Sequence, residues 1–269
     1  MTGKLKTFSA LLLLILLNVS VCSQGSKPAS APPEFRKVDN FAFKAGEKLT
    51  FDVKYGFIKA GVATMEIPQV KKISGRDVFR IVFQVASASG FDWFYKVRDR
   101  YETYMDVEGL FPWRFEQHVR EGSYSRDFSA FFDHRRGKAI TSGGEYSIPK
   151  FVNDIVSAFY LARTYNYSKM KPGEKIRLEN FYDNKVFPLD VVYRGRERVT
   201  VSAGTFDCVL IEPLVQQGGL FKSEGNILVW LTDDNLKMPV KVKTKVIVGS
   251  IDAELTACEG LAGKATSRR

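Results

Sequence analysis

The main pattern along the chain is an alternation of apolar and polar residues with a period of two. Between Gly46 and Tyr55, for example, Leu49, Phe51 and Val53 alternate with polar neighbours. This period is typical of strands that bury one face, and turn-forming residues separate the runs. The predicted strands cover residues 46–55, 61–67, 78–86, 98–107, 113–120, 125–133, 173–182, 186–193, 199–202, 206–213, 226–232, 240–248 and 250–256.

One segment in the middle of the chain departs from this pattern. Val152, Ile155 and Phe159 fall at helical spacing, and the residues between them include neither glycine nor proline. The spacing predicts one amphipathic helix of about three turns over residues 152–164. We therefore expect a mainly β protein with a single central helix.

The strands before the helix resemble those after it. A shift of about 127 residues superimposes the two sets without a gap and aligns Gly46 with Gly173. The matches fall at turn glycines, at strand-breaking prolines and on apolar strand faces. We predict one domain over residues 43–258, made of two related, curved antiparallel sheets. Their arrangement is half-barrel or sandwich-like, with the helix as the bridge. The two units cover residues 43–133 and 170–258.

The N-terminal residues have the layout of a secretory signal peptide, with Lys4 and Lys6 before a short apolar run. We predict a signal peptide over residues 1–23, a flexible Pro-rich spacer over 24–42 and a disordered tail over 259–269. No later segment is apolar over a membrane-spanning length. The expected location is the periplasm of the cell envelope.

The first cysteine offers two alternatives. Cys22 follows the apolar run as the acylated cysteine of a bacterial lipoprotein does, although Val21 stands where such signals have a small residue. Either Cys22 carries lipid and tethers the protein, or cleavage follows Cys22 or Ser23. The remaining cysteines, Cys208 and Cys258, either form a disulfide or are two small buried side chains.

The chain is basic, with a formal net charge of +10. Lysines and arginines are dispersed, with clusters at residues 71–72, 194–198 and 237–245. This distribution predicts solvated strand faces, or a peripheral attraction to an anionic membrane surface. An exported protein is a poor candidate for nucleic-acid binding.

Residues 90–95 bring several aromatic side chains together after a run of small residues. Because successive strand residues point to opposite faces, these side chains cannot all point inward. They form the lip of an apolar pocket or touch a membrane, or else they plug the ends of the sheets. A similar loop recurs in the second unit. The predicted ligand-binding residues are Phe91, Trp93, Phe94, Tyr95, Phe159, Tyr160 and Phe221.

The polar side of the predicted helix carries Asp154, Ser157 and Arg163. One interpretation makes these residues a polar anchor for the head group of a ligand. The other makes Asp154 or Asn153 the N-terminal cap and places Arg163 near the negative end of the helix dipole.

No motif of a known catalytic machinery is found. The chain has no nucleophile elbow, HExxH helix, P-loop or glycine-rich dinucleotide turn. Its two histidines, His118 and His134, lack the spacing of metal ligands. We expect no enzyme activity, no cofactor and no metal site.

Several segments also carry a resemblance to a known family. They are AGEKLTFDVKY (45–55), DIVSAFY (154–160), AGTF (203–206), LTDD (231–234) and GSIDAEL (249–255). In kind and order they resemble those of the bacterial exported family catalogued as domain of unknown function 3108. The resemblance spans nearly all of the predicted mature chain. It implies an envelope protein of antiparallel β structure, and it supplies no catalytic residue because the family has no established activity.

Three functional hypotheses follow from these observations. The first is a non-enzymatic carrier whose concave apolar interior takes a lipid-like or other hydrophobic molecule. The second is an envelope scaffold that binds another protein through a sheet edge or the aromatic loop, without a ligand. The third is a hydrolase that acts on an envelope polymer, with carboxylates brought together from distant strands.

Overall fold

The computed structural model describes residues 35–214, 227–245 and 249–269. Residues Phe35–Arg269 form one compact unit. Its elements are β1 (Lys48–Tyr55), β2 (Ile58–Ile73), β3 (Arg76–Ser87), β4 (Arg98–Asp106), β5 (Pro112–Glu121), β6 (Tyr124–Asp133), β7 (Lys138–Thr141), β8 (Gly144–Ser147), α1 (Ile155–Ala162), β9 (Lys175–Tyr182), β10 (Lys185–Val201), β11 (Gly204–Leu214), β12 (Ile227–Thr232), β13 (Pro239–Lys245) and β14 (Ser250–Glu259).

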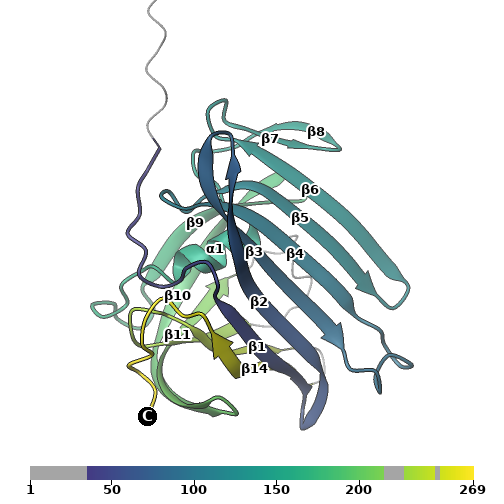
Figure 1. Ribbon diagram of the computed structural model, residues 1–269, viewed down its shortest axis with the longest axis vertical. Helices are drawn as coiled ribbons and strands as arrows, with labels where there is room; N and C mark the ends of the chain where they lie inside the picture. Colours follow the sequence, from purple (N-terminus) through teal and green to yellow (C-terminus); the bar gives the residue numbers. More distant parts are fainter. Residues whose placement is uncertain (1–34, 215–226, 246–248) are drawn as a thin grey trace, which may run out of the picture. The chain divides into compact units, whose positions relative to one another are not determined.

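All fourteen strands belong to one antiparallel sheet, in the order β8-β7-β6-β5-β4-β3-β2-β1-β14-β13-β12-β11-β10-β9 (Figure 1). The mainly β, antiparallel prediction is confirmed, but the two predicted sheets are the two halves of one. They join where β1 pairs with β14, for example at Phe51 opposite Leu255. This pairing gives a partner to two strands that would otherwise be exposed edges.

The internal repeat is visible in the backbone. β1 and β9 begin at the predicted offset of about 127 residues, as do β5 and β13. The turn before each first strand also repeats. Gly46 donates its N–H to Ile67 O at 2.7 Å, and Gly173 donates to Tyr193 O at 2.8 Å. Both glycines have a positive φ, of 94° and 96°.

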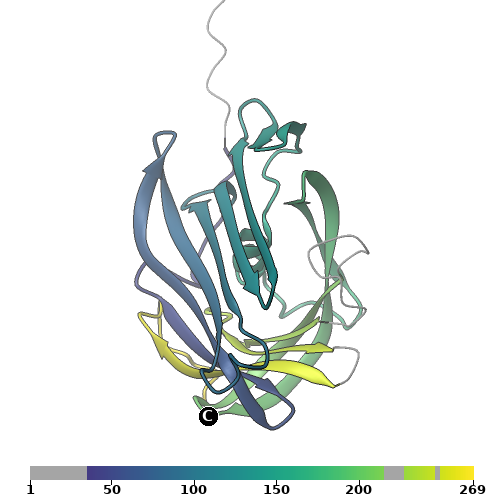
Figure 2. The same cartoon turned by 90° about the vertical axis from the view of Figure 1, so that its right-hand side faces the viewer.

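Side chains near the two ends of the open sheet contact each other. The Arg126 guanidinium on β6 lies 2.9 Å from the Asp183 carboxylate beside β9. The rings of Phe132 and Phe181 meet edge to face, with centroids 5.7 Å apart. Among the strands described, no backbone pairing joins β8 to β9. The sheet therefore curves back on itself without closing, as Figure 2 shows.

The helix α1 begins later than predicted because its cap comes from inside the predicted segment. Asp154 Oδ1 accepts the N–H groups of Val156 (2.8 Å) and Ser157 (2.9 Å), and Ser157 Oγ accepts the Asp154 N–H (2.9 Å). This capping box fixes the first turn. Phe151, just before it, has φ 60° and so cannot belong to a right-handed helix.

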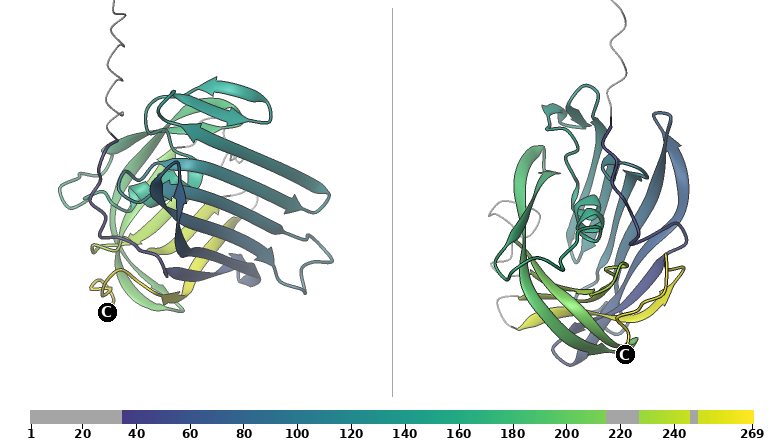
Figure 3. Two further views of the ribbon diagram at one scale, coloured as in Figure 1. Left: turned by 45° about the horizontal axis from the view of Figure 1, so that its top comes forward. Right: turned by 90° about the vertical axis from the view of Figure 1, so that its left-hand side faces the viewer.

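The segment that leads into α1 ties the helix to both halves of the sheet (Figure 3). On one side, Thr103 Oγ1 of β4 donates to Asp154 Oδ2 at 2.6 Å. On the other, Asn153 pairs with β9: its N–H donates to Glu179 O (2.8 Å) and its carbonyl accepts the Phe181 N–H (2.7 Å). The helix thus lies between the two halves, as expected of a bridge.

The predicted spacer, residues 24–42, is too long. Arg36 donates from Nε to Gly109 O at 2.7 Å, and Val38 N–H donates to Glu108 O at 2.8 Å. Residues 35–42 are therefore part of the fold, held on the β4–β5 turn. The predicted signal peptide and Cys22 lie outside the described residues.

The C-terminal residues, predicted to be disordered, are bound to the sheet. Ser267 Oγ donates to Asp234 Oδ2 at 2.9 Å, and Arg269 N–H donates to Thr205 O at 2.9 Å. Asp234, in the β12–β13 turn, and Thr205, at the start of β11, thus hold the C-terminal residues on the sheet. Cys208 and Cys258 are free, so they do not form a disulfide. No helix in the part of the chain described is long and apolar enough to span a bilayer.

Candidate functional site

One face of the curved sheet packs on the hydrophobic core; we call it the concave face. Along β1 its residues alternate with solvated ones, as the period of a strand requires. Leu49 is 0% and Phe51 3% exposed, Val53 is half-buried, and Tyr55 is 45% exposed. Burial therefore falls steadily from the start of β1 to the β1–β2 turn.

Strand β3, which β2 separates from β1, repeats this gradient. Ile81 is fully buried, whereas Phe83 and Val85, two and four residues further, are only partly buried against the core. The Phe83 ring lies 5.9 Å from that of Tyr101 on β4. Together with Val53, these side chains form an apolar wall that is partly open to solvent toward the turns.

A polar group missed in the sequence lies in this wall. Gln117 of β5 is opposite Tyr101 of β4 and 2% exposed. Its Oε1 has no hydrogen-bond partner within the described residues. Gln117 shares one face of β5 with Phe115 and Val119, and this period of two could have predicted that it points inward. The Gln117 side-chain amide also lies within hydrogen-bonding reach of the Tyr101 and Tyr182 hydroxyls, so rotation of the amide would give this oxygen a partner without a ligand.

A second missed feature is a carboxyl pair at the outer end of the wall. Burial raises the pKa of Asp99 and of Glu121, and the two carboxyls share a hydrogen bond. Asp99 Oδ1 also accepts the Arg120 N–H at 2.9 Å. A directly bonded pair is closer than the roughly 5 Å or more that separates glycosidase carboxylates. The pair thus gives no support to the hydrolase hypothesis.

The predicted helix residues lie at the deep end of the concave face. Tyr160 is fully buried, and its ring meets that of Phe43 edge to face at 4.9 Å. Burial raises the pKa of Tyr160. Phe159 is half-buried and packs against the core. Both residues therefore belong to the packed core around the helix, and the partly exposed wall lies outside it.

The polar residues of the helix are occupied by internal contacts. Asp154 and Ser157 are fully buried in the capping box, as the capping interpretation requires. Burial raises the pKa of Asp154 to about 6, although hydrogen bonds from Thr103, Ser157 and Val156 oppose the shift. These two residues hold the helix start, and neither presents an exposed polar atom to a ligand.

Arg163, the C-cap residue of α1, is equally enclosed. Its guanidinium forms a bidentate ion pair with Glu47, at 2.7 and 2.9 Å, and both side chains are 0% exposed. Its other donors bind carbonyl oxygens, including those of Ala42 and Leu236. Arg163 therefore joins the N-terminal segment, the start of β1 and the β12–β13 turn.

The aromatic run is separate from the helix and lies in the β3–β4 loop. Trp93 is 85%, Phe94 74% and Tyr95 48% exposed, whereas Phe91 is half-buried. The interpretation of the first three as inward plugs is wrong, because the loop turns them out from the end of the sheet. No ring contact within the described residues joins them to the helix aromatics. Phe221 lies outside the described residues.

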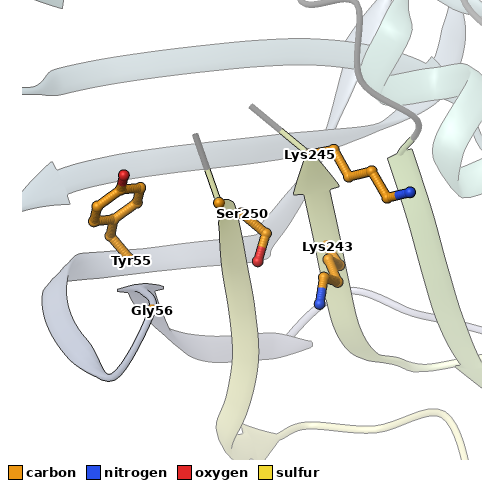
Figure 4. A pocket seen from close by; sticks show the side chains of 6 residues that line it. Tyr55, Gly56, Lys243, Lys245 and Ser250 are labelled. Carbon is orange, nitrogen blue, oxygen red and sulfur yellow. The ribbon is translucent and has the colours of Figure 1, made fainter. Parts of the chain in front are cut away.

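A surface pocket of about 550 Å³ opens at the same end of the sheet (Figure 4). Its lining comes from the β1–β2 turn and from the adjoining ends of β13 and β14. It contains two lysines and one aromatic ring. The lining residues are Tyr55, Gly56, Lys243, Lys245, Gly249 and Ser250.

The described residues contain no cluster of His, Cys, Asp and Glu that could hold a metal ion. His134 is buried, and its Nε2–H donates to Pro112 O at 2.7 Å. His118 is on the surface beside Asp127, at 2.7 Å. Burial raises the pKa of the Cys208 thiol to about 12, so this cysteine is a poor nucleophile.

The fold and the site define a class: open, barrel-like antiparallel β proteins whose curved sheet encloses one helix. The family model described as "Protein of unknown function (DUF3108)" matches residues 50–256, and the chain belongs to this family. No curated protein matches the chain.

Three solved structures are similar to the chain. The first is a β-barrel-like protein of domain of unknown function DUF1849 from Brucella abortus. Its TM-score is 0.51, with 11% identity over 80% of this chain and 97% of that chain. The second is a candidate exported protein with a YmcC-like fold from Bacteroides fragilis. Its TM-score is 0.32, with 13% identity over 82% of this chain and 99% of that one. The third is a candidate lipoprotein from Parabacteroides distasonis. Its TM-score is 0.37, with 10% identity over 83% and 100%. The Brucella likeness shows the fold alone.

Proposed function

We propose that the protein is an exported envelope protein that carries a hydrophobic molecule on its concave face. The observation that carries the proposal is the burial gradient along β1, from Leu49 at 0% to Tyr55 at 45% exposed. An apolar strand face that extends beyond the core leaves part of its surface in contact with water. Exposed apolar surface costs about 25 cal/mol per Å². A bound apolar molecule would remove this cost along the wall.

The wall also indicates what kind of molecule fits. Phe83, Val85 and Tyr101 offer an apolar surface with ring faces, suited to an acyl chain or a similar group. The proposed ligand is therefore a lipid-like molecule whose apolar part lies against the wall.

The exported location rests on the N-terminal sequence. Lys4 and Lys6 before the apolar run at residues 10–17 are the features of a signal peptide. Both the carrier and the scaffold hypotheses require this exported location. The scaffold alternative differs in that its concave face would hold no ligand.

Native mass spectrometry of the protein extracted gently from its own envelope tests the carrier proposal. We expect a bound species in the lipid mass range. Val85→Glu, which places a charge on the wall, should lose this species. Gln84→Glu adds the same charge on the opposite, solvated face of β3 and should retain it. Circular dichroism and the melting temperature show that each variant is folded.

Two outcomes would overturn the proposal. A bare mass for the extracted wild-type protein would favour the scaffold alternative. Equal retention by folded Val85→Glu and Gln84→Glu would place the bound molecule elsewhere than on the wall.

A further inference from the structure

Exposed aromatic side chains collect at one end of the strands. In the described part of the chain seven aromatic residues are exposed, and the only one elsewhere is Phe41. The other six lie in the turns that follow β1, β3 and β5 or at the strand ends beside these turns. They are Tyr55, Phe57, Trp93, Phe94, Tyr95 and Tyr124.

These turns are neighbours in the sheet. The hairpins β5–β6, β3–β4 and β1–β2 are consecutive in the strand order, and β14 and β13 follow β1; the three turns point the same way (Figure 1). We call these three turns, together with the adjoining ends of β13 (Lys245) and β14 (Ser250), the hairpin rim. Eight strands at about 4.8 Å spacing give the rim a length of roughly 34 Å. That length is enough to contact several lipid head groups at once.

Contacts between adjacent turns hold the aromatic residues at the rim. Gly122 N–H of the β5–β6 turn donates to Lys96 O of the β3–β4 loop at 2.8 Å. The Tyr95 ring lies so close to Gly122 that a Cβ there would come within 2.9 Å of it. A Cβ at Gly249 would lie 3.6 Å from the Tyr55 ring, an ordinary contact distance. Trp93 and Phe57, 85% and 105% exposed, remain at the outer surface.

The rim also carries positive charge. Lys96 and Lys245 are exposed, and Lys243 lines the surface pocket together with Lys245. None of these three forms an ion pair with a carboxylate of the described residues. Lys59, next to Phe57 in the β1–β2 hairpin, is 52% exposed and is paired with Asp52. Aromatic side chains among lysines are complementary to the interface of an anionic bilayer.

We propose that the hairpin rim docks on a bilayer that contains anionic phospholipid, with Phe57, Trp93 and Phe94 inserted at head-group depth. At the opposite end of the sheet, the β4–β5 turn is covered by Arg36, which binds Gly109 O and Leu110 O. Docking by the rim would bring the open end of the concave face to the membrane. The proposal itself stands without any ligand on that face.

Vesicle binding tests the proposal. The protein used begins at Gln24, so that it lacks the apolar N-terminal run and Cys22. We expect it to sediment with vesicles of phosphatidylglycerol and phosphatidylcholine, and much less with phosphatidylcholine alone. The double variant Phe57→Ser, Trp93→Ser should bind the anionic vesicles at least tenfold more weakly. Phe41→Ser removes the exposed aromatic residue outside the rim and should bind like wild type.

Tryptophan fluorescence gives a second measurement. Trp113 and Trp230 are 2% and 7% exposed, so a blue shift on adding vesicles reports on Trp93. We expect this shift with anionic vesicles and its reversal in 0.5 M salt, since screening weakens surface attraction. Absence of wild-type binding would overturn the proposal. So would undiminished binding by the double variant, or an equal loss in Phe41→Ser.

Discussion

Glu47 and Arg163 form a bidentate ion pair from which solvent is excluded, although 116 residues separate them in the chain. Each buried charge is compensated by the other. Desolvation makes such a pair a weak source of net stability, but a single partner left alone is a buried, uncompensated charge. The pair therefore makes the position of α1 depend on the start of β1.

Glu47→Gln should reduce the free energy of unfolding by about 3–5 kcal/mol, because Arg163 would keep its charge without a counter-ion. Urea unfolding measures the change. Glu66→Gln is the matched control, since Glu66 pairs with Lys48 at the surface, at 3.2 Å. That change should cost less than about 1 kcal/mol. Equal effects of the two substitutions would contradict our assignment of the buried pair.

Asp154 should make the protein less stable as the pH rises through about 6. Burial raises its folded-state pKa to about 6, above the unfolded value, so its contribution is complete at low pH and lost as the carboxyl ionises. The difference in unfolding free energy between wild type and Asp154→Asn should fall by about 3 kcal/mol from pH 3.5 to pH 7. Asparagine is also a good N-cap, which isolates the charge. A difference that is flat across this range would refute the assignment.

His134 should have the opposite dependence. Burial lowers its folded-state pKa to about 4, so its contribution is complete above the unfolded value of about 6.5 and is lost as the pH falls through 4. The change is about 3 kcal/mol. His134→Gln keeps a donor for Pro112 O and does not titrate. We expect the wild type to lose stability relative to this variant between pH 7 and pH 4. A parallel pair of pH–stability curves would be the contrary result.

Gly46→Ala and Gly173→Ala should cost similar amounts, about 1–2 kcal/mol each, because both sites have φ near +95° and no atom near a new Cβ. Strain in the backbone is then the whole effect. Gly90→Ala is the control, since Gly90 also has open space but no positive φ. Thermal or urea unfolding of the three variants compares them. A much larger loss at one of the two related turns would show that the halves of the sheet differ in stability there.

The sequence predicted the strands and the repeat because both depend on local patterns. Alternation placed Phe51 and Val53 on one face of β1, and the matching turn glycines Gly46 and Gly173 revealed the repeat. The sequence could not show that β1 pairs with β14. Strand pairing depends on which edges remain open once all strands exist, and no local period records that.

The same reasoning explains the candidate site. Trp93 was found because an aromatic run is unusual anywhere in a chain. Gln117 was missed because it is a single polar residue on an apolar strand face. The pairing of Asp99 with Glu121 was missed because Asp99 stands between two arginines, and only the neighbouring strand shows which carboxyl lies beside it. Asp154 was open to two interpretations until the positions of its donors showed the cap.

The pairing of β1 with β14 also has a consequence for biogenesis. Thr256 Oγ1 donates to Thr50 O across 206 residues of sequence, so the centre of the sheet joins the earliest strand to the last one. Contacts of such high sequence separation form slowly, because loop closure must precede them. A chain that crosses a membrane from its N-terminus cannot complete this seam until its final strand has emerged. For an exported chain, as proposed, the topology would therefore delay completion of the sheet until transport is finished.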